Sequence, residues 1–429
     1  MDSTPSLASP TALGRLRRHT EDPLYRMGYL LIAGAGITSL LGFVFWILAA
    51  RSYPARVVGA NSAAISAMMF VSGVCQLGLP AVLVRYIPTA GGGTRKLVKG
   101  SLLLTAGLSL ALGAAAALTS GLWSPSLRFL ARDASWLADF VLATTAWTLF
   151  SLQDGVLTGL RVTHWVPVKN AIFAATKLAL LFALTGLSPF AGPFLAWNVP
   201  GVLVVIGFMW LIFRRLLPAG DAPDASAELD SPRLLKLAAG NYLAQLFGIA
   251  AIFVMPIVVA DVTNATTTAY FYVPWTLALA LLLVCQNTAS ALTVEAALDE
   301  DQLGPLFRRS LAHTLWLLVP LVAVVIIGAP ILLSAYGPKY AHAGAPLMRL
   351  LALGAFPNVF VTLGLAVARI HHRGRAVLGI QAAECVPLIA LSIVLLHTDG
   401  LVGVGWAYLG SQWAVAIWLS FTSLRPLFR

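Results

Sequence analysis

The sequence predicts an all-α membrane protein with about twelve spanning helices, and three observations support this fold class. Hydrophobic residues make up 59% of the 429 residues, and charged residues only 10%. A soluble domain carries roughly 25% charged residues, so lipid must be the main solvent of this chain. Apolar runs of spanning length recur along the chain, and basic residues gather at alternate ends of these runs.

The first span follows a polar segment, 1–27, which contains Arg15, Arg17, Arg18 and Arg26. We expect this segment to be a flexible basic tail in the cytoplasm. The run that follows, 28–50, lacks the small-residue cleavage site of a signal peptide, so we interpret it as a transmembrane helix.

The first set of predicted spans is 28–50, 58–84, 98–120, 136–160, 166–187 and 193–216. The second set is 234–260, 268–295, 310–334, 345–370, 377–397 and 402–421.

The longest connection, 217–232, lies between the two sets and is rich in Ala, Asp, Pro and Ser. We expect it to be a cytoplasmic linker between a lobe at 28–216 and a lobe at 233–429. No loop is long enough to fold as a separate catalytic domain, so the sequence does not indicate an enzyme.

Positive charge is distributed very unevenly between the two sides of the predicted bundle. One side carries only Arg51, Arg56, Arg128, Arg132 and Lys339. The other side, together with both termini, carries most of the remaining Lys and Arg residues. The positive-inside rule places that richer side, and both termini, in the cytoplasm. The net charge of +11 therefore indicates membrane orientation, and no nucleic-acid partner is expected.

The two halves resemble each other as weak internal repeats. Val74-Cys75-Gln76 in the second span matches Val284-Cys285-Gln286 in the eighth. Because each half has six spans, both enter the membrane from the same side. The repeat is then parallel, with a pseudo-two-fold axis along the membrane normal.

The three cysteines, Cys75, Cys285 and Cys385, each lie in an apolar run without a second Cys or His at ligand spacing. We therefore expect small buried residues at these positions, and no metal site or cofactor is predicted.

Several motifs together resemble a known transporter family. They are Gly42-Phe43-Val44-Phe45-Trp46, Leu83-Val84-Arg85-Tyr86-Ile87-Pro88, Gln153-Asp154-Gly155-Val156-Leu157-Thr158-Gly159-Leu160-Arg161 and Met348-Arg349-Leu350-Leu351-Ala352-Leu353. With them, the chain after about Arg26 resembles the polysaccharide repeat-unit flippases of the multidrug/oligosaccharidyl-lipid/polysaccharide exporter superfamily. The resemblance implies a MATE-like fold of two six-helix lobes around a cavity that opens alternately to each side. It also implies a polyprenyl-pyrophosphate-linked oligosaccharide as cargo.

Lys177 is the first candidate for contact with this cargo. It lies about 16 Å into the fifth span, too deep to reach either surface easily. Charges at such depth often mark a transport pathway, so Lys177 is predicted to bind the pyrophosphate or the sugar. The alternative is a structural lysine, paired or hydrogen-bonded between helices.

Glu384, about 10–12 Å into the eleventh span, is a candidate for proton coupling. Its alternative, which we favour from sequence, is a static pair with a lysine or arginine. Arg85 and Glu295 occupy equivalent repeat positions and either form a cytoplasmic gate or lie at the interface separately. Arg349 binds phosphate near the exit or anchors its helix, and Asp154 is expected to pair with the nearby Arg161.

Uncharged polar residues give the predicted cavity a lining for sugar hydroxyls. This lining comprises Gln76, Asn241, Gln245, Gln286 and Asn287. Hydrogen bonding between helices is the alternative for each of them.

The resemblance thus implies a lipid-linked oligosaccharide flippase of the cytoplasmic membrane, which we expect to be a monomer. A proton, a sodium ion and the membrane potential are the alternatives for what drives its cycle. Membrane lipids, a polysaccharide polymerase and glycosyltransferases are its expected partners. A multidrug or metabolite antiporter of the same superfamily is the alternative; it would need a smaller, more aromatic and acidic cavity. A membrane glycosyltransferase and an inactive scaffold are further alternatives.

Overall fold

The computed structural model describes residues 23–217, 232–296 and 302–428, and the chain there is almost entirely helical. Side chains at 23–35, 37, 232–241 and 428 lie outside this description. Most of the predicted tail and linker also lies outside the described residues.

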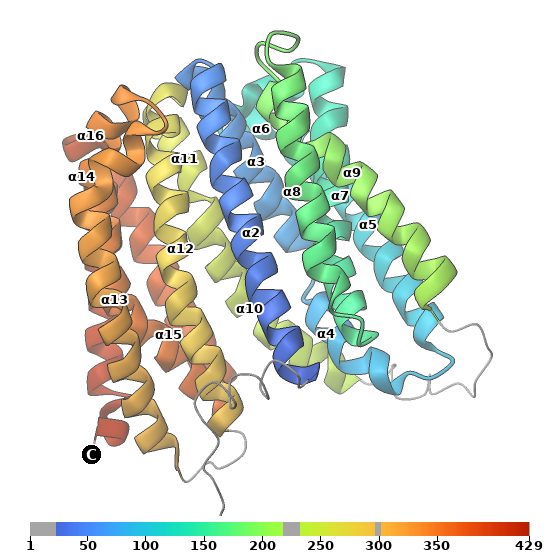
Figure 1. The fold of residues 1–429 in the computed structure, drawn as a ribbon, viewed down its shortest axis with the longest axis vertical. Coiled ribbons are helices and arrows are strands. Elements are labelled where there is room, and N and C mark those ends of the chain that lie inside the picture. The colour runs from blue at the N-terminus through green and yellow to red at the C-terminus, as the bar shows by residue number, and fades with distance from the viewer. Residues whose placement is uncertain (1–22, 218–231, 297–301, 429) are drawn as a thin grey trace, which may run out of the picture.

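The N-terminal half forms the helices on the right of Figure 1. They are α2 (Pro23–Ser52), α3 (Ala55–Cys75), α4 (Leu79–Tyr86), α5 (Thr94–Leu118), α6 (Ser120–Trp123), α7 (Ala134–Gly159), α8 (Trp165–Leu184) and α9 (Gly192–Leu211). Short helices connect or extend them: η1 (Ile87–Thr89), η2 (Pro125–Ala131) and η3 (Ile212–Leu216). Gly78, at φ 71°, lets the chain bend between α3 and α4, where an ordinary side chain would be strained.

The C-terminal half forms the helices on the left of Figure 1. They are α10 (Pro232–Phe253), α11 (Met255–Val262), α12 (Ala265–Ala296), α13 (Leu303–Ser334), α14 (Pro338–Leu353), α15 (Ala355–Ile370) and α16 (Gly374–Phe421), followed by η6 (Arg425–Phe428).

The long helix α16 is two helices joined by a sharp turn at Gly400, whose φ of 59° and ψ of −137° are not helical. A Cβ on Gly403 would lie 2.3 Å from the carbonyl oxygen of Leu395. In a continuous helix, residues eight apart are separated by about 12 Å. The chain therefore folds back at Gly400.

Eight described helices are long and apolar enough to cross a membrane, or up to ten if two bent pairs each make one span. The pairs are α10 with α11, bent by 44°, and α14 with α15, bent by 43°. In this count α16 is a single helix, and α2 is left out because its described apolar part is the shorter segment Thr38–Ser52. The all-α membrane fold is confirmed, and the count of twelve stays a prediction.

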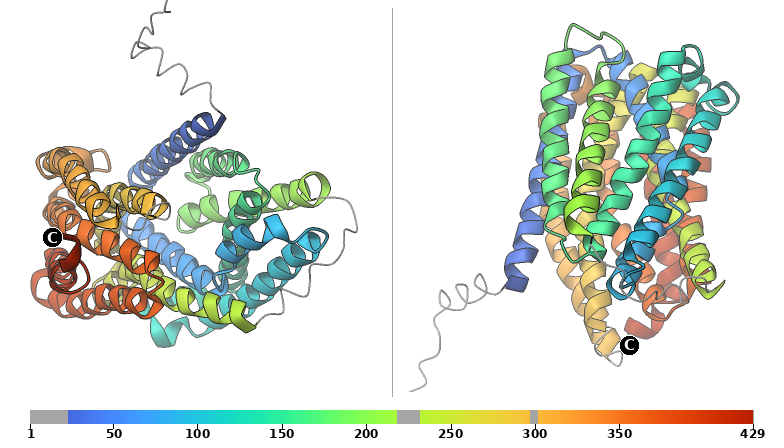
Figure 2. Two further views of the ribbon diagram at one scale, coloured as in Figure 1. Left: turned by 90° about the horizontal axis from the view of Figure 1, so that it is seen from below. Right: turned by 90° about the vertical axis from the view of Figure 1, so that its right-hand side faces the viewer.

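Burial shows where the two halves meet. Helix α3 is buried along most of its length and packs on α12 of the other half. By contrast, α13 exposes large apolar side chains such as Trp316 and Ile327, as expected of a helix that faces lipid. Seen along the helix axes, the two groups of helices lie side by side (Figure 2).

Candidate functional site

A cavity of about 1100 Å³ lies among α10, α12, α15 and α16 of the C-terminal half. Its size is at the upper end of the range for ligand-binding pockets. One residue from the other half, Arg85 at the end of α4, also lines it. The cavity is therefore bounded mainly by one half of the protein and touched by the other.

The mouth of this cavity is basic. Arg369 lies in the last turn of α15, and His372 and Arg373 follow just before α16 begins. Arg85 joins them from α4. All four of these side chains are exposed to solvent, so an anion can approach them from water. This end of the bundle, the lower end in Figure 1, is the side that the charge pattern predicts to be cytoplasmic.

The wall of the cavity is rich in carboxamides. It comprises Gln245, Gln286, Asn358, Gln381 and Gln412, with the hydroxyls of Ser290, Thr293 and Thr362. A carboxamide offers both donors and acceptors, which is the combination that a sugar hydroxyl requires.

Farther from the mouth, Trp275 and Tyr408 line the cavity with their rings packed edge to face, 5.8 Å between centroids. The Trp275 indole N–H donates to the carbonyl of Ile252 at 3.1 Å, which fixes the ring. The deeper part of the cavity is therefore aromatic as well as polar.

Glu384 lies in this cavity at one end of a hydrogen-bonded chain. Gln412 donates to a Glu384 carboxylate oxygen at 2.6 Å, and Asn358 donates to the Gln412 carbonyl at 3.3 Å. Thr362 in turn donates to Asn358 at 3.0 Å. The expected static pair of Glu384 with a lysine or arginine is absent from the described residues; an amide holds the carboxylate instead.

The opposite, upper end of the bundle is closed by contacts between the two halves. Arg51, at the end of α2, donates to the carbonyls of Ala335 and Ser334 at 2.8 and 2.9 Å. Asp261 of α11 accepts from the Ser124 hydroxyl at 2.9 Å and the Ser126 backbone N–H at 2.8 Å. The cavity therefore opens towards the basic side, while the other side is latched.

The two helices α3 and α12 also meet closely at this latched end. A Cβ on Gly59 would lie 1.6 Å from the carbonyl oxygen of Ala265, so only glycine permits this approach.

Lys177 lies elsewhere, in the N-terminal half, and does not line this cavity. It is 5% exposed and is surrounded by the rings of Phe45, Phe173 and Trp197. Arg349 is also outside the cavity: it is exposed and donates to the carbonyl of Ile326 at 3.1 Å. Neither of these two candidates for contact with the cargo therefore lines this cavity.

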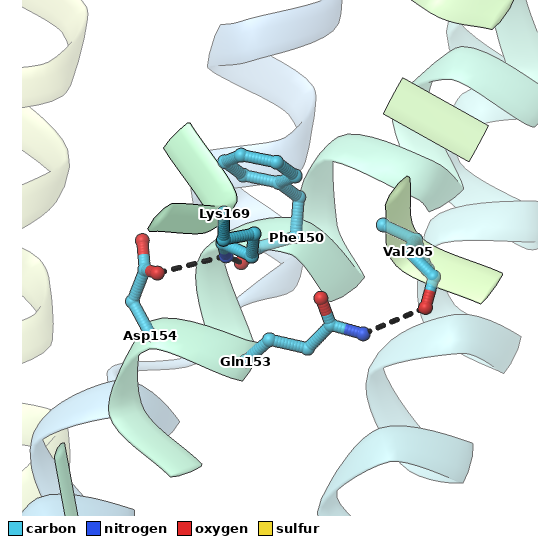
Figure 3. A network of polar contacts seen from close by, with 5 residues as sticks. All are labelled: Phe150, Gln153, Asp154, Lys169 and Val205. Atoms are coloured by element: carbon cyan, nitrogen blue, oxygen red, sulfur yellow. Dashed lines mark hydrogen bonds and ion pairs between the residues drawn. The ribbon is translucent and has the colours of Figure 1, made fainter. Parts of the chain in front are cut away.

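Asp154 pairs with Lys169, not with Arg161, which corrects the partner expected from sequence. The Lys169 ammonium lies 2.7 Å from an Asp154 oxygen and also donates to the Phe150 carbonyl (Figure 3). Lys169 is completely buried, whereas 36% of the Asp154 side chain is exposed. Proximity in sequence favoured Arg161, but its backbone at φ 61° belongs to the turn that ends α7.

The remaining predicted residues divide between the cavity and other places. Gln245 and Gln286 line it, but Asn287 is exposed outside it, and Gln76 contacts Ser72 of its own helix at 3.5 Å. Glu295 is exposed and forms no ion pair with Arg85, so the predicted gate pair is not present. The side chain of Asn241 lies outside the described residues.

Sequence reasoning missed several cavity residues: Arg369, Arg373, Asn358, Gln381 and Gln412. In the sequence analysis, Arg369 and Arg373 counted only as positive charges that indicate the orientation of the chain in the membrane. The three amides occur at helix positions whose side chain direction depends on packing, and a spacing pattern does not reveal it.

Comparison with solved structures shows the same architecture over almost the whole chain. The lipid II flippase MurJ in an inward closed conformation matches with a TM-score of 0.74 and 14% identity, covering 92% of this chain and 87% of that one. The chain has the MATE and MurJ fold. A MATE transporter in complex with MaL6 matches with a TM-score of 0.64 and 15% identity, covering 96% and 98%.

A transporter of the MOP superfamily from Pyrococcus furiosus, described as having a binding pocket of reverse polarity, also shares the fold. It matches with a TM-score of 0.66 and 13% identity, covering 96% and 98%. At such identities the likeness concerns the fold alone. No family model matches the sequence, and no curated protein matches it.

Proposed function

We propose that this protein is a transporter that carries a polyprenyl-pyrophosphate-linked oligosaccharide across the cytoplasmic membrane, for the synthesis of cell-surface polysaccharide. The proposal rests chiefly on the cavity described above, with its basic mouth and its carboxamide wall. The MOP-superfamily fold, the family resemblance and the spanning helices support the same class of function.

The two chemical parts of the cargo match two parts of the cavity. A pyrophosphate bears negative charge, and Arg369, Arg373 and Arg85 at the mouth supply guanidinium groups that bind phosphate oxygens in pairs. The sugar extends inwards, where Gln245, Gln381 and the other amides replace its water contacts. The polyprenyl chain stays in the bilayer, since it is as apolar as lipid.

The closed upper end of the bundle indicates that the transport cycle has a second state, in which this end opens. In the conformation described, cargo enters from the basic side, and the contacts of Arg51 and Asp261 close the other. Release to the opposite leaflet requires these contacts to break while the basic mouth closes. This is alternating access by movement of one half against the other.

A multidrug or metabolite antiporter coupled to a cation is the second candidate. Trp275, Tyr408 and Glu384 in the deeper cavity favour it, because ring faces and a carboxylate suit an organic cation. The basic mouth disfavours it, since arginines repel a cation at the point of entry. We therefore rank the anionic lipid cargo first.

The cellular setting follows from the proposal. We place both termini in the cytoplasm, on the side of the basic mouth, and expect a monomer. Because the transported unit must be built on one side and used on the other, glycosyltransferases supply the cargo and a polymerase consumes it. These enzymes are the proposed partners.

A reconstitution experiment tests the cargo. Purified protein is placed in liposomes with lipid-linked repeat units extracted from the producing cells, and a glycan-cleaving enzyme outside reports their arrival in the outer leaflet. The double variant Arg369→Gln/Arg373→Gln should lose most of the activity. Arg214→Gln/Arg215→Gln, which alters two exposed arginines of η3 away from the cavity, should keep it. Equal activity of both double variants would contradict the role of the mouth, and no transport by the unaltered protein would contradict the cargo.

A further inference from the structure

Lys177 is a buried cation for which the described residues provide no anionic partner. It is 5% exposed in the outer half of α8, about 10 Å from the end of that helix at Leu184. The other lysine of α8, Lys169, forms an ion pair with Asp154 of α7. A buried charge without a partner is costly, so its presence calls for a function.

The rings of Phe45, Phe173 and Trp197 form an aromatic cage around the Lys177 ammonium. Its Nζ lies 3.8 Å from the ring centroid of Trp197, 5.0 Å from that of Phe45 and 5.1 Å from that of Phe173. The faces of such rings carry negative potential, which attracts a cation and repels an anion. The site therefore suits neither a pyrophosphate nor a chloride ion. A free sodium ion is also disfavoured, because the tethered ammonium repels it.

We propose that the ligand of this cage is a proton held by Lys177 itself, and that its binding and release drive the transport cycle. The amine lone pair accepts a proton from water on one side of the membrane, and the ammonium returns it to water on the other. The neutral amine packs among rings without a charge cost, and the ammonium gains cation–π contacts. The cage thus accommodates both forms. This inference rests on the proposed transport function for its cargo, but proton binding itself can be measured alone.

The charged groups around the cage leave one carboxylate available among the described residues. Helices α2, α7 and α9 pack on α8. The described part of α2 carries Arg51, which is engaged with α13, and α9 (Gly192–Leu211) carries no charge. On α7, Asp154 is engaged by Lys169, whereas Asp139 accepts only an amide hydrogen bond, from Asn198 at 3.3 Å.

Asp139 marks a route for the proton from the latched end. It is partly exposed and lies in the second turn of α7, about 8 Å from the start of that helix. Asn198, its hydrogen-bond partner, directly follows Trp197 of the cage in α9. These contacts lead from the rim of the bundle to Lys177.

Helix α2 connects the cage to the contacts between the two halves. Phe45 belongs to the cage, and the adjacent Trp46 packs on Tyr272 of α12 with 4.7 Å between ring centroids. Arg51, about 9 Å farther along α2, holds the carbonyls of α13. A change of charge at Lys177 therefore acts on the helix that joins the lobes.

A fluorine NMR titration tests proton binding without any cargo. The full-length protein is labelled with 5-fluorotryptophan in nanodiscs, and the Trp197 resonance is assigned with Trp197→Phe. Between about pH 5 and about pH 10 this resonance should shift in one step in the unaltered protein. It should stay constant in Lys177→Met, which has no charge, and in Lys177→Arg, which is always charged. A flat resonance in the unaltered protein, or the same step in Lys177→Met, overturns the proposal.

A flux measurement in proteoliposomes tests coupling. An acidic exterior should accelerate the transfer of lipid-linked repeat units several-fold, and this response should vanish in both Lys177 variants. Lys99→Met, an exposed lysine on α5, is the matched control and should keep it. Replacement of sodium by N-methyl-D-glucamine should change nothing. A requirement for sodium, or a transfer rate that does not depend on the pH gradient, overturns the proposal of proton coupling. If the unaltered protein transfers no lipid-linked repeat units at all, the proposed cargo is wrong. The fluorine NMR titration then still tests whether Lys177 binds a proton.

Discussion

Gln412 donates a 2.6 Å hydrogen bond to Glu384 between the two segments of α16 that flank Gly400, so the turn at Gly400 brings both side chains into one cavity. Gln412 is completely buried, and its carbonyl also accepts from Asn358 of α15. One amide therefore ties three segments of the cavity wall together. We infer that Gln412 holds the wall in shape, while Glu384 faces the space inside.

Gln412→Leu should therefore destabilise the C-terminal half. Removal of one partner leaves Asn358 and Glu384 without their contacts, and a buried polar group left unsatisfied costs about 1–3 kcal/mol. Thermal unfolding in detergent should occur at a lower temperature than for the unaltered protein. Ser411→Ala is the control, because the hydroxyl of Ser411 bonds only within its own helix, to Tyr408. Equal stability of the two variants would contradict the proposed role of Gln412.

Arg51→Gln should loosen the latched end of the bundle. The guanidinium donates to two carbonyls at the end of α13, and hydrogen bonds from a charged donor are stronger than neutral ones. A cysteine introduced at Leu279 in the cavity reports the opening. Labelling by a membrane-impermeant maleimide added outside should become several-fold faster.

The matched control for this prediction is Arg56→Gln. Arg56 is exposed at the same end, near the start of α3, and makes no hydrogen bond or ion pair among the described residues. The native Cys75, Cys285 and Cys385 are buried, so background labelling should be low. If both arginine variants label at the same rate, the latch assigned to Arg51 is wrong.

Gly59→Ala should separate α3 from α12. The new Cβ would lie 1.6 Å from the carbonyl of Ala265, so a backbone must move, and overpacking of this kind costs about 1–3 kcal/mol. Gly100→Ala is the control: it lies in α5 with open space around its Cβ position, where alanine favours the helix. The unfolding temperature should fall for the first variant and stay level or rise for the second. The reverse order would show that the two helices do not approach as described.

The sequence predicted the fold class well, because hydropathy is a sum over many residues; the orientation stays a prediction. It predicted four residues of the cavity: Arg85, Gln245, Gln286 and Glu384. It did not predict which way Lys177 or Arg349 points. In a membrane bundle the face towards lipid and the face towards the interior are both apolar, so periodicity does not reveal the direction of a side chain.

The partners of charged residues were also beyond prediction from sequence. Asp154 is seven residues from Arg161 and fifteen from Lys169, yet it pairs with the latter because α7 and α8 fold against each other. Similarly, the exposed guanidinium of Arg51 meets carbonyls near residue 335, in the other half. Such contacts depend on tertiary structure that no local pattern encodes.

The Asp154–Lys169 pair gives an asymmetric prediction. Asp154→Asn leaves a fully buried ammonium without its anion, whereas Lys169→Met leaves a carboxylate that is 36% exposed and can reach water. Loss of one partner of a buried pair costs up to about 3–5 kcal/mol, and partial exposure of the remaining charge reduces that cost. Asp154→Asn should therefore unfold at a lower temperature than Lys169→Met. The double variant Asp154→Asn/Lys169→Met, with no charge left, should be more stable than Asp154→Asn alone. If Lys169→Met proves the less stable single variant, the Phe150 carbonyl and ring, which also contact the ammonium, contribute more than the carboxylate does.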